Sequence, residues 1–219
     1  MVACVPRDFG YIVLIGGNAV TNAPWMYIPA IFAIVAAGVN LTRRVWIVNA
    51  IALAIQYLAV FVLLCTVRPV SLAVVKLFVG WMVTLTLFLS LITDGELRKA
   101  SGLPKFSAGE IFRLLAGLFA AFFLAAFLPS LQSVVFPQTA LPLLLAAFSL
   151  LVLGLFQASM ISEPFYVIIG LLTFLLGVEL LYASLELSIL LEALFAGVNL
   201  GLALVGAFFV IKDAELLEP

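Results

Sequence analysis

Charged residues divide this chain into long apolar runs, and these runs predict helices that cross a membrane. No charge occurs between Asp8 and Arg43, and most later charges stand in short clusters between apolar runs. A spanning helix needs about 20 apolar residues, and several of the runs reach that length. They lack the alternation of apolar and polar positions that a membrane barrel requires. The sequence therefore predicts an all-α, polytopic bundle of about seven transmembrane helices.

The breaks between the runs place the predicted spans. Glycines, asparagines and a proline interrupt the first run, so residues 11–20 are interpreted as a short or half-inserted segment. Residues 94–110 form the clearly polar stretch and predict a surface loop, and Pro129 predicts the end of a span near Leu128. The expected spans are 25–39, 45–67, 70–93, 111–128, 140–158, 164–184 and, after a turn at 186–188, a last span that ends near 211.

The positions of Lys and Arg orient the predicted bundle. If seven spans alternate, the two sides of the membrane carry unequal numbers of these residues. One side holds Arg43, Arg44, Arg98, Lys99, Lys105, Arg113 and Lys212, and the other holds Arg7 and Arg68. Short loops rich in Lys and Arg stay in the cytoplasm. We therefore expect a multi-pass protein of the inner (cytoplasmic) membrane, with its amino terminus outside and its carboxyl terminus inside.

Composition supports the membrane assignment and excludes several functions. Hydrophobic residues make up 66% of the 219 positions and charged residues 10%, whereas a soluble domain has about 25% charged residues. A net charge of −1 gives no basis for binding nucleic acid. The chain has no His, and Cys4 and Cys65 stand far apart, so we expect no metal and no cofactor. It also lacks a phosphate-binding glycine loop and a nucleophile motif, so we expect no catalysis by the chain alone.

Three ionisable residues fall inside predicted spans: Lys76, Glu179 and Glu192. A charge at mid-helix costs about 2.5–3.5 kcal/mol on insertion, so each one invites a partner or a role. Glu179 lies seven residues before Glu186 in the turn, and Glu192 lies six residues after it. In an antiparallel hairpin both carboxylates therefore reach the same level, roughly 10 Å below the outer surface. Lys76 follows Pro69 by seven residues and enters from the same side.

Two interpretations of these three residues stay open. They form a proton or cation relay, because neighbouring buried carboxylates beside an ammonium exchange a proton when their surroundings change. Alternatively, they form an ion pair that fixes helix packing, or they extend to the membrane surface. Mid-span amides are expected to form hydrogen bonds between helices, and glycines in the last span predict close helix packing. The amides are Asn49, Gln56 and Asn199, and the glycines are Gly197, Gly201 and Gly206.

The last three predicted spans resemble the complex I subunit K family. Residues 178–184 (VELLYAS) look like that family's second helix, and residues 200–204 (LGLAL) look like its third. The resemblance implies that Glu179 takes the role of the family's proton-relay glutamate. The family's third helix carries a second glutamate just before the Gly-Leu-Ala stretch. Gly197 occupies about that place here, and the nearest acidic residue is Glu192.

The whole chain resembles a longer relative, the E-type membrane subunit of hydrogenase-4-like complexes. That subunit has a similar length, and the likeness extends to the early arginine loop at Arg43, to Lys76 within residues 74–78 (VVKLF) and to Arg98. The resemblance implies one integral membrane domain, with a four-span part (1–128) ahead of a three-span, subunit-K-like part (140–211).

The same resemblance implies a non-redox subunit of a membrane oxidoreductase complex that moves protons or sodium ions. Its partners would be an antiporter-like membrane subunit and peripheral redox subunits on the cytoplasmic face. Two alternatives remain: a structural or assembly subunit without an ion pathway, and a small independent transporter. The transporter is disfavoured because no span has an obvious unwound substrate motif and the halves show no clear internal repeat.

Overall fold

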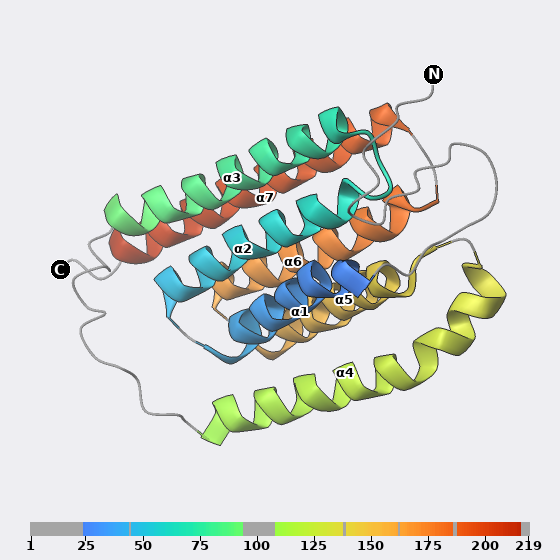
Figure 1. Cartoon of the computed structure of the whole chain (residues 1–219). Coiled ribbons are helices and arrows are strands. Elements are labelled where there is room, and N and C mark those ends of the chain that lie inside the picture. The colour runs from blue at the N-terminus through green and yellow to red at the C-terminus, as the bar shows by residue number, and fades with distance from the viewer. Residues whose placement is uncertain are drawn as a thin grey trace.

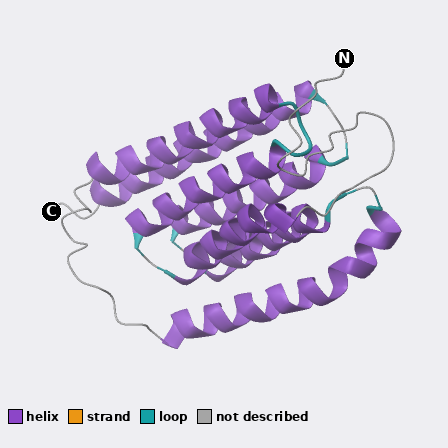
Figure 2. Ribbon diagram, viewed as in Figure 1, coloured by secondary structure: helices purple, strands orange, loops and turns teal. Residues whose placement is uncertain are grey.

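Seven long helices dominate the described part of the chain, which contains no strand (Figures 1 and 2). The computed structural model describes residues 24–43, 45–93, 108–137, 139–161, 163–185 and 188–215. Each of these seven helices is long and apolar enough to cross a membrane. The predicted all-α, seven-span bundle is thereby confirmed, and the chain is a multi-pass membrane protein. The expected half-inserted segment at 11–20 lies outside the described residues.

The helix boundaries follow the predicted breaks closely at most positions. A short 3-10 helix, η2 (Pro24–Met26), precedes α1 (Tyr27–Thr42), α2 (Trp46–Leu64), α3 (Val70–Thr93), α4 (Ala108–Val135), α5 (Leu141–Met160), α6 (Pro164–Ala183) and α7 (Ile189–Glu215). Proline stands in the first turn of α5 and of α6, where its missing N–H removes no intrahelical hydrogen bond. These prolines therefore begin helices rather than break them.

Helix α4 departs from the prediction at both ends. It begins at Ala108, inside the stretch expected to be a loop, and it continues through Pro129 to Val135. The expected end at Leu128 was therefore wrong. A proline removes one backbone donor, whereas ending the helix in hydrocarbon would leave several backbone groups unpaired. The ribbon of α4 bends in its last turns (Figure 1), as expected of a helix that contains proline.

The helices pack in successive pairs, with α4 on one side (Figure 1). Helices α3 and α7 lie side by side on one face, α2 and α6 come next, and α1 and α5 follow. Helix α6 is central: 61% of its membrane-spanning stretch is buried inside the bundle. For α4 the buried share is 17%. The four-span and three-span parts are therefore interleaved, because α3 packs on α7 and α1 packs on α5.

Helices α5 and α6 approach each other closely, and glycine makes this approach possible. A Cβ atom added at Gly170 would stand 2.7 Å from the backbone nitrogen of Ala158 and 2.9 Å from the carbonyl oxygen of Gly154. One added at Gly177 would stand 2.7 Å from the carbonyl oxygen of Ala147. Small residues let helix backbones approach closely, so these glycines fix α6 against α5.

The glycines of α7 fit the packing prediction only in part. A Cβ atom added at Gly197 or Gly201 would meet no described atom within 4 Å, so the expected close packing at these two positions was wrong. Gly206 does pack, because a Cβ there would approach side chains of Leu87 and Ile168. The turn of the helix places the first two glycines on its outward face, which sequence spacing alone does not reveal.

Candidate functional site

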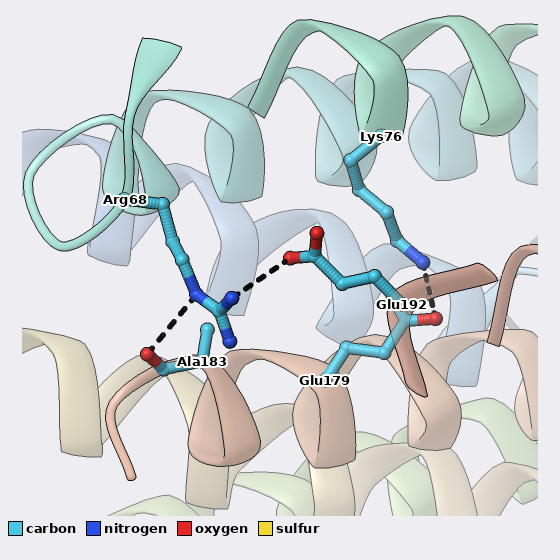
Figure 3. A network of polar contacts seen from close by, with 5 residues as sticks. All are labelled: Arg68, Lys76, Glu179, Ala183 and Glu192. Carbon is cyan, nitrogen blue, oxygen red and sulfur yellow. Dashed lines mark hydrogen bonds and ion pairs between the residues drawn. The ribbon is translucent and has the colours of Figure 1, made fainter. Parts of the chain in front are cut away.

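Three polar side chains from different helices meet inside the bundle. Lys76 Nζ of α3 forms an ion pair with Glu179 Oε1 of α6 (Figure 3). Asn199 Nδ2 of α7 donates a hydrogen bond of 2.7 Å to the same oxygen. The side chains of Lys76 and Glu179 are 10% and 5% exposed, and Asn199 is fully buried. We call these three residues the Lys–Glu–Asn cluster.

The helix ends explain why the cluster forms where it does. Glu179 lies four residues before the end of α6 at Ala183, and Lys76 lies six residues after the start of α3. At 1.5 Å per residue, both are within roughly 10 Å of the same end of the bundle, where the α2–α3 and α6–α7 turns lie. We call this the outer end, following the predicted orientation. Helix α7 packs on both α3 and α6 and brings Asn199 to the carboxylate.

Glu192 belongs to a second ion pair at the outer end. Its Oε1 lies 3.5 Å from Nη1 of Arg68, in the turn before α3 (Figure 3). Arg68 Nε also donates to the carbonyl oxygen of Ala183 at 3.3 Å. The last carbonyls of a helix lack intrahelical partners and carry partial negative charge, so a guanidinium is favourable there. The structure therefore pairs Lys76 with Glu179 and places Glu192 with Arg68.

The Lys–Glu–Asn cluster retains acceptor capacity that the protein does not use. Glu179 Oε2 and Asn199 Oδ1 are buried and have no hydrogen-bond partner among the described residues. The same holds for the hydroxyl of Tyr57, a fully buried side chain of α2. Buried polar atoms are nearly always paired, so each unpaired acceptor is energetically costly and would be stabilised by gaining a hydrogen. One carboxylate oxygen holds the ion pair, while the other can accept a proton.

Buried amides continue the polar line from the cluster toward the opposite, inner end. Gln56 Oε1 accepts a hydrogen bond of 3.1 Å from Thr173 Oγ1, which joins α2 to α6. Thr173 lies six residues before Glu179 on α6, or about 9 Å along the helix. Nearer the inner end, Gln157 Nε2 donates to the carbonyl oxygen of Tyr166 at 3.1 Å. Gln56 and Gln157 are fully buried, and each keeps one amide atom without a partner among the described residues.

Two asparagines stand at the inner end of this line. Asn49 Nδ2 donates to the carbonyl oxygen of Arg43 at 3.1 Å and so ties α2 to the residue that follows α1. Asn40 of α1 is fully buried, and neither of its side-chain polar atoms has a partner among the described residues. Of the three predicted amides, Asn199 joins the cluster, Gln56 links two helices, and Asn49 closes a turn.

Several of these residues did not stand out in the sequence. The sequence predicted that Arg68 and Glu192 both lie near the outer surface, but it did not pair them. Their opposite charges were the available signal for the ion pair that the structure shows. Thr173 and Tyr57 lie in apolar runs and carry no such signal. Asn40 and Gln157 were visible as amides near helix ends, but only the packing of the helices shows that they are buried.

Known proteins supply no further guide to this site. Within the described residues, no three Cys, Asp or Glu side chains lie together as a metal ion would require. No protein-family model, no curated protein and no solved structure matches the chain. The geometry of the Lys–Glu–Asn cluster is therefore the basis for assigning a function.

Proposed function

We propose that this chain carries protons through the membrane by way of Glu179. It acts as a non-redox subunit of a complex-I-like or hydrogenase-4-like respiratory complex in the inner (cytoplasmic) membrane. The observation that carries the proposal is the buried Lys–Glu–Asn cluster, in which one carboxylate oxygen is ion-paired and the other is unpaired. An antiporter-like membrane subunit would lie beside it, with peripheral redox subunits on the cytoplasmic face.

The energetics of burial support a role beyond holding helices together. Removing two charges from water costs several kcal/mol per ion, and a well-packed apolar pair is often at least as stable as a buried ion pair. Charges that persist inside membrane segments usually mark ion or proton pathways. Lys76 and Glu179 lie within spanning helices and are almost fully buried, so they meet this description.

The geometry favours a proton over a sodium ion. Sodium would need several oxygen ligands, and the ammonium of Lys76 already contacts Glu179 Oε1. A second cation at this carboxylate would be repelled by Lys76, and the repulsion is strong where water is scarce. A proton requires a single acceptor, which Glu179 Oε2 supplies. Protonation of Glu179 would release Lys76, so proton arrival and movement of the ammonium are coupled.

The remaining polar groups provide routes to the two ends of the bundle. Toward the inner end, the unpaired amide atoms of Gln56 and Gln157 are suited to hold waters between the cluster and the surface. Toward the outer end, Glu192 is 24% exposed and connects through Arg68 to the end of α6. Glu192 thus offers an exit to water close to the cluster.

A structural or assembly role is the second candidate, and a specific observation favours it. The ion pair is fully formed and joins α3 to α6, while Asn199 adds α7, so the cluster also pins three helices together. An independent transporter has less support. Each of the seven spanning helices in the described residues is continuous, whereas small transporters commonly unwind a helix at the substrate.

The test replaces Glu179 with Gln in the native host and compares Glu163→Gln as the matched control. Glu163 is an exposed glutamate just before α6, remote from the cluster in sequence and at the opposite end of that helix. Membrane vesicles would report proton uptake with a pH-sensitive dye while electron transfer is driven. We expect Glu179→Gln to lower proton uptake by about 100-fold, the scale of a lost general acid–base group. The control should keep wild-type uptake.

Each other outcome would decide against the proposal in a defined way. Full proton uptake by a normally assembled Glu179→Gln complex contradicts the relay. Loss of the assembled complex, with normal uptake per remaining complex, identifies a structural subunit. Uptake of sodium that disappears in Glu179→Gln, with proton uptake unchanged, assigns the pathway to sodium instead.

A further inference from the structure

An apolar groove opens between α1 and α4 at the inner end, away from the Lys–Glu–Asn cluster. Its volume is about 380 Å³. Apolar side chains and glycines make up most of its wall: Ile34, Gly38, Leu114, Gly117, Ala121 and Leu153. Arg43 and Arg113 also line it. Arg43 directly follows α1 and Arg113 lies in the second turn of α4, so both stand at the groove's inner end.

The groove exists because α4 stands apart from the bundle and because small residues face the gap. Helix α4 packs mainly on α5 and only lightly on α1 (Figure 1). A Cβ atom added at Gly38 would meet no described atom within 4 Å. The wall extends nine residues along α1 from Arg43 to Ile34, which corresponds to about 13 Å of depth. The space is therefore elongated along α1 and largely apolar.

The charge at its inner end is positive. Arg43 and Arg113 contribute two positive charges, and Glu110, one turn before Arg113, contributes one negative charge. Arg113 is 6% exposed, and its Nε donates to the carbonyl oxygen of Gly109 at 3.2 Å. Both arginines keep interactions within the protein, but a guanidinium carries five N–H donors and can bind a phosphate as well. Basic pockets on the cytoplasmic side of membrane helices suit anionic headgroups.

We propose that the groove binds one anionic phospholipid, with an acyl chain between α1 and α4 and its phosphate against Arg43 and Arg113. The apolar length fits a chain that runs along the helices, and guanidinium–phosphate pairing fixes the head at the inner surface. A helix from another protein would not fit. With a diameter of about 10 Å, a helix segment 13 Å long occupies about 1,000 Å³. The lipid would fill the gap and hold α4 against α1.

The test measures lipid retention by the purified full chain with native mass spectrometry. Phosphatidylglycerol and phosphatidylcholine with identical acyl chains serve as the probes. We expect the wild-type chain to retain one phosphatidylglycerol about tenfold more tightly than phosphatidylcholine. Gly38→Leu fills the groove and should weaken phosphatidylglycerol binding by at least about tenfold. Gly201→Leu is the matched control, because its added side chain also enters open space but on α7, so it should bind like wild type.

A second variant keeps the proposal testable if Gly38→Leu does not fold. Arg43→Gln changes a residue at the end of α1 and should remove most of the preference for phosphatidylglycerol. Equal retention of the two lipids by the wild-type chain would overturn the proposal. So would wild-type retention of phosphatidylglycerol by a folded Gly38→Leu chain. Loss of phosphatidylglycerol in Gly201→Leu to the same degree would also place the lipid elsewhere.

Discussion

At the scale of single residues, Lys76 and Glu179 stabilise the fold only while both are present. Their side chains are 10% and 5% exposed, so neither charge has water to compensate for a lost partner. Asn199 adds one hydrogen bond to the carboxylate but no charge. The sequence indicated that both residues reach the same level of the membrane. It could not indicate that they touch, because contact depends on helix rotation and on which helices are neighbours.

Replacing Lys76 with Met should therefore destabilise the chain strongly. Breaking a buried ion pair costs about 3–5 kcal/mol, because the remaining charge is left buried and unpaired. The double variant Lys76→Met with Glu179→Gln should recover a large part of the lost stability, because the unpaired charge of Glu179 is then removed as well. Denaturant unfolding in detergent measures both. A double variant as unstable as Lys76→Met alone would contradict the pairing.

At the scale of helices, sequence patterns located the elements but not all of their ends or contacts. The length of the apolar runs set six of the seven spans closely, because hydrocarbon demands continuous helix. Pro129 misled the prediction for α4, since one lost hydrogen bond costs less than a helix end inside the membrane. The packing glycines were sought on α7, whereas the close contact lies between α5 and α6. Spacing identifies small residues, but not the face that meets a neighbour.

The close contact of α5 with α6 predicts a contrast between two glycines. Gly170→Val would place its Cβ 2.7 Å from the backbone of Ala158 and force the helices apart. Overpacking of this kind typically costs about 1–3 kcal/mol. Gly197→Val faces open space, so steric overlap should not add to its cost. Thermal unfolding in detergent should rank Gly170→Val well below Gly197→Val, and equal melting temperatures would contradict the packing.

At the scale of the whole molecule, the described residues form seven helices long enough to span a membrane, and the Lys/Arg bias predicts their orientation. The composition and run lengths were sufficient for the seven-span bundle. The order of the helices in space was not predictable, because the pairing of α3 with α7 and of α1 with α5 joins segments far apart in sequence. That interleaving is what brings Lys76 from the first half of the chain to Glu179 in the second.

The orientation predicts where reporters fused to the chain will be active. Green fluorescent protein attached after residue 219 should fluoresce, because the Lys/Arg bias predicts that α7 ends on the cytoplasmic side. Alkaline phosphatase is active only outside the cytoplasm, so it should be inactive when fused after residue 219. It should be active when fused to a chain truncated between α4 and α5. The reverse pattern would invert the bundle and move the Lys–Glu–Asn cluster to the cytoplasmic third.

A proton relay requires that Glu179 change its protonation state while the protein works. Infrared difference spectroscopy on reconstituted membranes, recorded after a pH gradient is imposed, measures this directly. We expect a carboxylate band and a carboxylic acid band to change in opposite directions. Both changes should vanish in Glu179→Gln and persist in Glu163→Gln. A difference spectrum that is the same with and without Glu179 would contradict the relay, because Glu179 would then remain a fixed partner of Lys76.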